Sequence, residues 1–185
     1  MIRATLSTAR RAFRRAAADE EGSSTIPFVI FAPFFLMLVV SSVEMGVLMI
    51  RHVMLERAMD LTVRGLRLGT YNPPDQTTIK RDICNLAGVI PNCMNALLVE
   101  LRPVSTTTWQ PLASGPTCVD RGAPVQPVVT FTPGTGDEMM LIRACAKFVP
   151  LFPMSGLGFS LPKDDTGAYA LVAATAFVNE PTPGS

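Results

Sequence analysis

The sequence contains an uncharged run over residues 22–43 in which apolar side chains dominate. From residue 26 to residue 50 the only charged side chain is that of Glu44. About 20 helical residues, each rising 1.5 Å, cross the roughly 30 Å hydrocarbon core of a bilayer. The run is therefore long enough to form a membrane-spanning helix, and a hydrophobic share of 48% in 185 residues is typical of a membrane-linked protein.

A cleavable secretory signal is the alternative interpretation of this run. The apolar region of such a signal has about 7 to 15 residues and ends at a small-x-small cleavage site. Here the run is longer and continues into "SSVEMGVLMI" without an Ala-x-Ala site. We therefore expect a retained helix. Arginines flank it on both sides, five before and four shortly after, so charge alone does not decide its orientation.

Four cysteines, Cys84, Cys93, Cys118 and Cys145, all follow the apolar run. An even number on one side of a membrane segment favours disulfides in an oxidising compartment. Zinc is the competing use, but the spacings contain no CxxC pair and the single histidine, His52, lies next to the membrane segment. Four cysteines allow three pairings; we expect Cys84 with Cys93, which closes a short loop, and Cys118 with Cys145. Disulfides place the C-terminal part outside the cytoplasm and the N-terminus inside.

Beyond the apolar run, apolar and small residues continue to recur every three or four positions, which predicts an amphipathic helix. The residues of this stripe are Val47, Ile50, Met54, Ala58, Leu61, Gly65 and Leu68. We expect one unbroken helix over residues 23–69, ended by the glycine and prolines of "GTYNPP". The stripe can pack on the chain's own domain or on other copies, and both interpretations stay open.

The rest of the chain predicts an α+β fold in which the long helix is followed by a small antiparallel sheet domain with disulfides. A helix is expected over 75–87, between an acidic cap and Gly88, and strands over 98–104, 128–132, 139–151 and 168–180. The prolines and glycines between the first two strands predict a long irregular loop, which we expect Cys118 to attach to the rest of the domain through a disulfide. The expected division is a basic cytoplasmic leader (1–22), the long helix (23–69), an extracytoplasmic domain (70–180) and a flexible tail (181–185).

Groups for catalysis are scarce in this sequence. A single histidine leaves no Ser/His/Asp or Cys/His set. The "GLG" at 156–158 is a weak phosphate-loop match and predicts a turn, and so do "KDDTG" at 163–167 and the acids at 137–138. Residues 70–185 hold seven Lys/Arg against nine Asp/Glu, so no basic patch for nucleic acid is expected. We expect neither an enzyme nor a cofactor or metal site, although an anchored hydrolase stays open.

The run "EEGSSTIPFVIFAPFFLMLVVSSVEMG" resembles the N-terminal region of the TadE-like minor pilins or pseudopilins of the Tad (Flp) pilus assembly system. Gly22 matches the glycine before the processing point, Ser23 the new first residue, Pro33 the proline within the helix, and Glu44 the acid before Gly46. The closing "AATAFVNEP" is similar to the last strand of such proteins. The resemblance covers about a sixth of the chain well.

The resemblance implies a pilin-like fold and a minor pilin held in the inner membrane, with its domain in the periplasm or outside the cell. It would act by helix packing and protein contacts during pilus assembly. The implied partners are pilin subunits, Tad assembly proteins and a prepilin peptidase, in a homo- or hetero-oligomer. The alternative is a membrane-anchored binding module of the envelope, unrelated to pili.

Pro27 departs from the family pattern, which has an acid at this position that is expected to pair with the N-terminal amine of a neighbouring subunit. Either the leader is cut after Gly22 without that acid, or it is not cut and the protein is an anchored assembly factor. Proline is tolerated in the first helical turn, whereas Pro33 is deeper and predicts a kink or a free carbonyl. Glu44 either reaches the outer membrane boundary or pairs with an arginine or amine of another chain.

Overall fold

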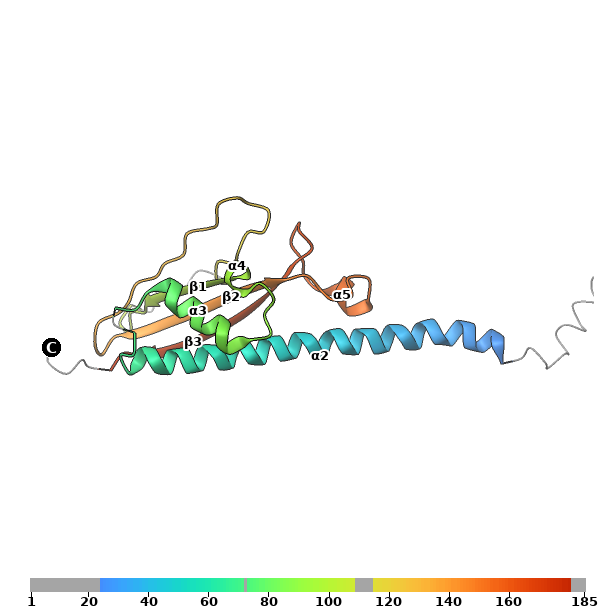
Figure 1. Cartoon of the computed structure of the whole chain (residues 1–185), viewed down its shortest axis with the longest axis horizontal. Coiled ribbons are helices and arrows are strands. Elements are labelled where there is room, and N and C mark those ends of the chain that lie inside the picture. Colours follow the sequence, from blue (N-terminus) through green and yellow to red (C-terminus); the bar gives the residue numbers. More distant parts are fainter. Residues whose placement is uncertain (1–23, 72, 109–114, 181–185) are drawn as a thin grey trace, which may run out of the picture.

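The computed structural model describes residues 24–71, 73–108 and 115–180, and its fold is α+β (Figure 1). The expected processing site at Gly22 and Ser23, and the expected tail over 181–185, lie outside the described residues. The elements follow in the order α2 (Thr25–Arg67), α3 (Gln76–Ala87), α4 (Cys93–Ala96), β1 (Leu97–Pro103), β2 (Met139–Phe148), α5 (Gly156–Ser160) and β3 (Tyr169–Val178).

The long helix α2 runs without a break for 43 residues, which confirms the predicted single helix. It begins at Thr25, so Pro27 lies in the first turn, where backbone N–H groups have no helical partner. The helix also continues through Pro33, whose missing N–H leaves the carbonyl of Val29 without its usual donor. At about 65 Å by the helical rise, α2 projects far beyond the other elements in its N-terminal half (Figure 1).

The sheet has three antiparallel strands in the order β1-β2-β3. These strands confirm three of the four predicted ones. The expected strand over 128–132 is wrong: in this segment only Phe131 forms an isolated bridge, to Leu101. Pro127 and Pro133 bound the segment on both sides, and since proline cannot donate to a ladder, few residues remain for pairing.

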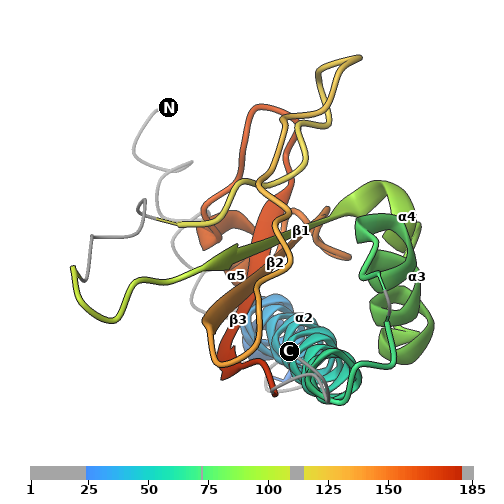
Figure 2. The same cartoon turned by 90° about the vertical axis from the view of Figure 1, so that its left-hand side faces the viewer.

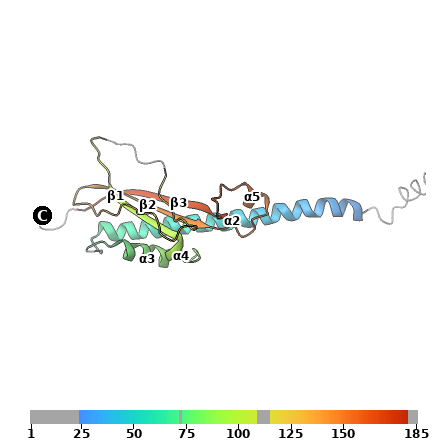
Figure 3. The same ribbon diagram turned by 90° about the horizontal axis from the view of Figure 1, so that it is seen from above.

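Helices α2 and α3 together cover one face of the sheet (Figures 2 and 3). As predicted, α3 starts at a cap, where the Asp75 carboxylate accepts a 3.0 Å hydrogen bond from the Thr78 N–H. It ends at Gly88, whose φ of 58° lies in the left-handed region that glycine adopts easily. The core between the two layers is filled by aliphatic side chains, among them Leu55, Ile79, Ile83, Leu97, Val99, Met140 and Ile142.

The face of α2 that packs on the domain differs from the predicted stripe, of which only Ala58 is buried. Ile50, Leu61 and Leu68 are exposed instead. Apolar residues occur on several sides of this helix, so more than one stripe with the same period can be drawn, and contact with α3 and β3 selects one. The buried side chains of α2 are Glu44, Leu55, Ala58, Met59, Thr62 and Val63.

Two disulfides, Cys84–Cys93 and Cys118–Cys145, hold the domain, and both predicted pairings are confirmed. The first joins the last turn of α3 to the start of α4. The second ties the irregular segment between β1 and β2 to the middle of β2, on the face of the sheet away from the helices. This segment therefore stays close to the sheet despite having little regular structure of its own.

Candidate functional site

Glu44 is the most unusual side chain of the long helix. It is fully buried, yet it follows directly on the most apolar stretch of α2, none of which is buried. Its Oε1 accepts a 3.1 Å hydrogen bond from the Leu151 N–H, and its Oε2 accepts one of 2.9 Å from the Phe152 N–H. Each carboxylate oxygen is thus capped by one of two successive backbone amides from a segment over a hundred residues away in the sequence.

The capping segment is the connection between β2 and β3, whose residues 149–162 we call the α5 loop. Its short helix α5 lies beside the N-terminal half of α2 (Figures 1 and 3). A Cβ on Gly156 would lie 3.1 Å from the Met37 Cε and 3.5 Å from the Ser41 Oγ. Met37, Ser41 and Glu44 are spaced four and three residues apart and so share one helical face. The α5 loop therefore follows α2 from Glu44 toward its N-terminal end.

The "GLG" at 156–158 has a structural role in this loop. The predicted turn is wrong here, because residues 156–160 form the one-turn helix α5. Ser155 starts it by accepting a 3.0 Å hydrogen bond from the Gly158 N–H with its hydroxyl oxygen. A Cβ on Gly158 would collide with the Phe152 carbonyl, so the close turn needs glycine at that position.

Large apolar side chains remain exposed on the α5 loop, most of all Met154 at 91% and Phe159 at 78%. Between the loop and α2 lies an open groove of about 480 Å³, lined almost entirely by apolar residues. The α2 side of the groove consists of Pro33, Leu36, Met37 and Val40. The exposed apolar surface is thus continuous from α2 onto the loop.

A second set of contacts joins α2 to the sheet where the first charged residues after Glu44 appear. The Arg51 guanidinium lies 5.0 Å from the ring centre of Phe148, and its Nη1 is 3.5 Å from the Tyr169 hydroxyl oxygen. The His52 Nε2 is 3.2 Å from the Val172 carbonyl oxygen. Together with the Glu44 cap, these contacts attach the domain to α2 at two positions along the helix axis, at Glu44 and at Arg51.

The "KDDTG" segment at 163–167 is the turn that the sequence predicts. The Asp164 Oδ2 is 2.7 Å from the Lys147 Nζ, and its Oδ1 accepts hydrogen bonds from the N–H groups of Thr166 and Ala168. The hydrogen bond from Lys147, followed by that from Thr166, holds the pKa of the Asp164 carboxyl well below its usual range. Asp164 thus organises the entry to β3.

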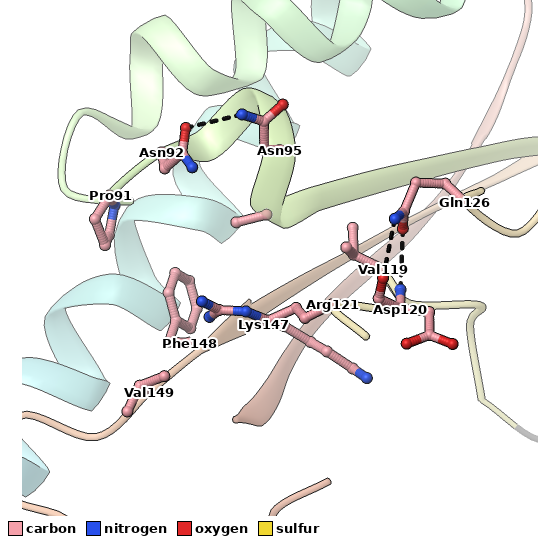
Figure 4. A pocket seen from close by; sticks show the side chains of 11 residues that line it. Pro91, Asn92, Asn95, Val119, Asp120, Arg121, Gln126, Lys147, Phe148 and Val149 are labelled. Atoms are coloured by element: carbon pink, nitrogen blue, oxygen red, sulfur yellow. Dashed lines mark hydrogen bonds between the residues drawn. The ribbon is translucent and has the colours of Figure 1, made fainter. Parts of the chain in front are cut away.

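A hollow of about 440 Å³ lies at the end of β2 that leads into the α5 loop (Figure 4). Apart from Arg121, its polar side chains are bonded to partners in the same chain. Asn95 donates to Asn92 over 3.1 Å, and the amide of Gln126 bonds to the backbone of Asp120 (Figure 4). Lys147, on its wall, is paired with Asp164. The hollow therefore offers few polar groups to a ligand.

No group of three or more His, Cys, Asp or Glu side chains that could hold a metal ion occurs within residues 24–71, 73–108 and 115–180. Within the same ranges, α2 is the one helix that is long and apolar enough to cross a membrane.

The site differs from the sequence expectation for Glu44 in one respect. The sequence left two interpretations open, a position at the outer membrane boundary or a cationic partner on another chain, whereas the structure supplies two backbone amides from the same chain. Nothing in the sequence near Glu44 indicates this partner. The one hint is the apolar, proline-rich composition of "VPLFPMSGLGF", which is unusual for a surface loop.

Comparison of the chain with protein-family models, with curated proteins and with solved structures found no match.

Proposed function

We propose that the protein is a membrane-anchored, minor pilin-like component for assembly of a Tad/Flp-type pilus. It acts by helix packing and protein contacts, without chemistry on a substrate. Its N-terminus lies in the cytoplasm, α2 crosses the inner membrane once, and the disulfide-bonded domain lies in the periplasm or outside the cell. In this proposal a prepilin peptidase cuts the leader between Gly22 and Ser23.

One observation carries the proposal: the N-terminal part of α2 is a free-standing apolar helix. Its large side chains from Ile26, 69% exposed, to Val39, 43% exposed, contact little of the chain itself. A surface of this extent needs a bilayer or other apolar helices around it. This part of the helix also carries the residues that resemble the TadE-like family.

The rest of the fold supports a mechanical role for this helix. The domain is attached to α2 through the Glu44 cap and through Arg51, so a force on the helix reaches the domain through defined contacts. The two disulfides support the outward placement of the domain, since disulfides persist in oxidising compartments. The helix would pack laterally with pilin helices in the membrane while the domain recognises assembly partners.

Photo-crosslinking from two exposed positions tests this function. A photoreactive residue at Phe35, 64% exposed on α2, should capture pilin subunits or Tad assembly proteins in membranes of the source organism. The matched control is Val128, which is 97% exposed but lies on the domain. Capture of no pilus component from Phe35, together with normal pili in a deletion strain, would remove the proposal. The protein would then be better described as an envelope binding module.

A further inference from the structure

We propose that the α5 loop enters the outer leaflet of the membrane beside α2, so that the chain contacts the bilayer through two elements joined at Glu44. The occupant of the apolar surface on the loop is lipid. The inference rests on the membrane placement of α2 proposed above but does not depend on a role in pili.

The first argument is the charge pattern of the loop. Residues 148–162 contain no charged side chain, and the nearest charges, Lys147 and Lys163, stand at the two ends. Apart from Ser160, whose hydroxyl donates to the Gly156 carbonyl oxygen, the exposed side chains between them are apolar, with Met154 and Phe159 the most exposed. A soluble domain seldom presents such a cluster to water, whereas a bilayer accommodates it without cost.

The second argument is the depth at which the loop lies along α2. Arg51 is the first charged residue after Glu44, so it marks the outer boundary of the apolar part of the helix. Glu44 then lies about 10 Å and Ser41 about 15 Å closer to the cytoplasmic end, at 1.5 Å per residue. The α5 loop contacts the helix at Ser41 and at Met37 beyond it. It is therefore placed beside a part of α2 that a bilayer surrounds.

The third argument is that more than half of the N–H groups of the loop are already hydrogen-bonded, which lowers the cost of entry into hydrocarbon. Pro150, Pro153 and Pro162 have no N–H group. The Glu44 carboxylate accepts hydrogen bonds from two of the other N–H groups, and further N–H groups donate to acceptors within the loop. The N–H groups with such partners belong to Leu151, Phe152, Ser155, Gly158, Phe159 and Leu161. Glu44 thereby supplies acceptors that water would supply to a loop in solution.

The charge at the end of the loop is already paired within the chain. The Lys163 Nζ donates a 2.6 Å hydrogen bond to the Gly158 carbonyl oxygen and lies 5.8 Å from the ring centre of Phe159. A carbonyl oxygen and an aromatic ring of the loop thus stabilise the ammonium next to the apolar segment.

Tryptophan quenching by brominated lipid tests the inference on the full chain. The native Trp109 is first replaced by Phe, and single tryptophans are then introduced as Met154→Trp, Phe35→Trp and Val128→Trp. Each variant is reconstituted at low protein density in phosphatidylcholine vesicles with or without brominated acyl chains. Phe35 reports on α2, and Val128 lies close to Phe131, which pairs with Leu101 away from the loop. Phe159→Trp repeats the measurement at a second loop position.

We expect the bromine-dependent loss of emission at Met154→Trp and Phe159→Trp to be similar to that at Phe35→Trp, with none at Val128→Trp. Quenching at Phe35→Trp alone would overturn the loop insertion and leave the membrane helix intact; shielded, unquenched emission at position 154 would then point to another copy of the chain. Absence of quenching at Phe35→Trp would refute the membrane placement, and the inference with it. Equal quenching at Val128→Trp would also overturn it, because the whole domain would then be adsorbed.

Discussion

Replacement of Glu44 by alanine should free the α5 loop from the long helix. The carboxylate accepts one hydrogen bond from each of two backbone amides, those of Leu151 and Phe152. A hydrogen bond to a charged group contributes about 1.5–3 kcal/mol, so the cap is worth about 3–6 kcal/mol to the closed loop. Alanine also leaves both N–H groups without an acceptor where water enters poorly.

Hydrogen–deuterium exchange of the full chain in nanodiscs measures this effect directly. Since each 1.4 kcal/mol corresponds to a factor of ten, a loss of about 3 kcal/mol should accelerate exchange across 151–161 roughly a hundredfold. Strand β3 should be unaffected, because its exchange depends on the sheet. Glu44→Gln keeps one acceptor oxygen, so its exchange rate across 151–161 should lie between those of the unmodified chain and of Glu44→Ala.

The matched control is Glu56→Ala, on the same helix. The Glu56 side chain is 54% exposed and its only described ion-pair partner is His52 at 3.6 Å, a surface contact worth about 0–1 kcal/mol. It should leave the exchange of the loop unchanged. Equal exchange across 151–161 in Glu44→Ala and in the unmodified chain would refute the reasoning, because the cap would then contribute nothing to closing the loop.

Three further predictions concern the stability of the domain, measured by denaturant unfolding of the full chain in detergent. Arg143→Ala should cost about 3 kcal/mol, the lower end of the range for breaking a buried ion pair, because the buried Glu100 loses the Arg143 Nη2 at 2.7 Å and keeps only the Arg102 Nη1 at 3.8 Å; replacing Glu100 and Arg143 together by apolar residues should cost far less. Replacing both cysteines of Cys118–Cys145, 27 residues apart in the sequence, by serine should lower the free energy of unfolding by about 3.5 kcal/mol. The same change at Cys84–Cys93, 9 residues apart, should lower it by about 2.5 kcal/mol, because the shorter loop restricts the unfolded chain less. The reverse order would contradict this chain-entropy argument. Because the pKa of Asp164 is depressed in the fold, its carboxylate stabilises the folded domain above about pH 4, and this contribution is lost as the pH falls. Asp164→Asn should therefore lower the free energy of unfolding at neutral pH and reduce its decrease in acid. An unchanged dependence of the unfolding free energy on pH would contradict this prediction.

The elements with strong local signals could be predicted from the sequence. The long helix follows from an uncharged run and from the glycine and prolines after it, and α3 from Asp75 and Gly88 at its ends. Strand β1 follows from alternation of apolar and polar residues, β2 from an apolar run with charges at Arg143 and Lys147, and β3 from an apolar run between a loop and the Pro/Gly/Ser tail. The disulfide pairing followed from the short loop between Cys84 and Cys93, which left one pairing for the other two cysteines.

What could not be predicted depends on contacts between distant segments. Ile50 and Leu61 have helical spacing as good as that of the buried residues, and only the positions of α3 and β3 decide which face is covered. The partner of Glu44 is separated from it by 107 residues in the sequence, and backbone amides leave no mark in the sequence. The short helix α5 depends on the Ser155 cap and on a close turn at Gly158, which a three-residue pattern does not reveal.

The central claim, a pilin-like protein held in the membrane by α2, is tested most directly by the mature N-terminus. The measurement is the intact mass and N-terminal sequence of the protein purified from membranes of its source organism. The account predicts a chain that begins at Ser23 and retains the whole of α2 with Glu44. A start beyond about residue 45, as an ordinary signal peptide would give, would contradict the anchor, and an intact Met1 would contradict pilin-like processing.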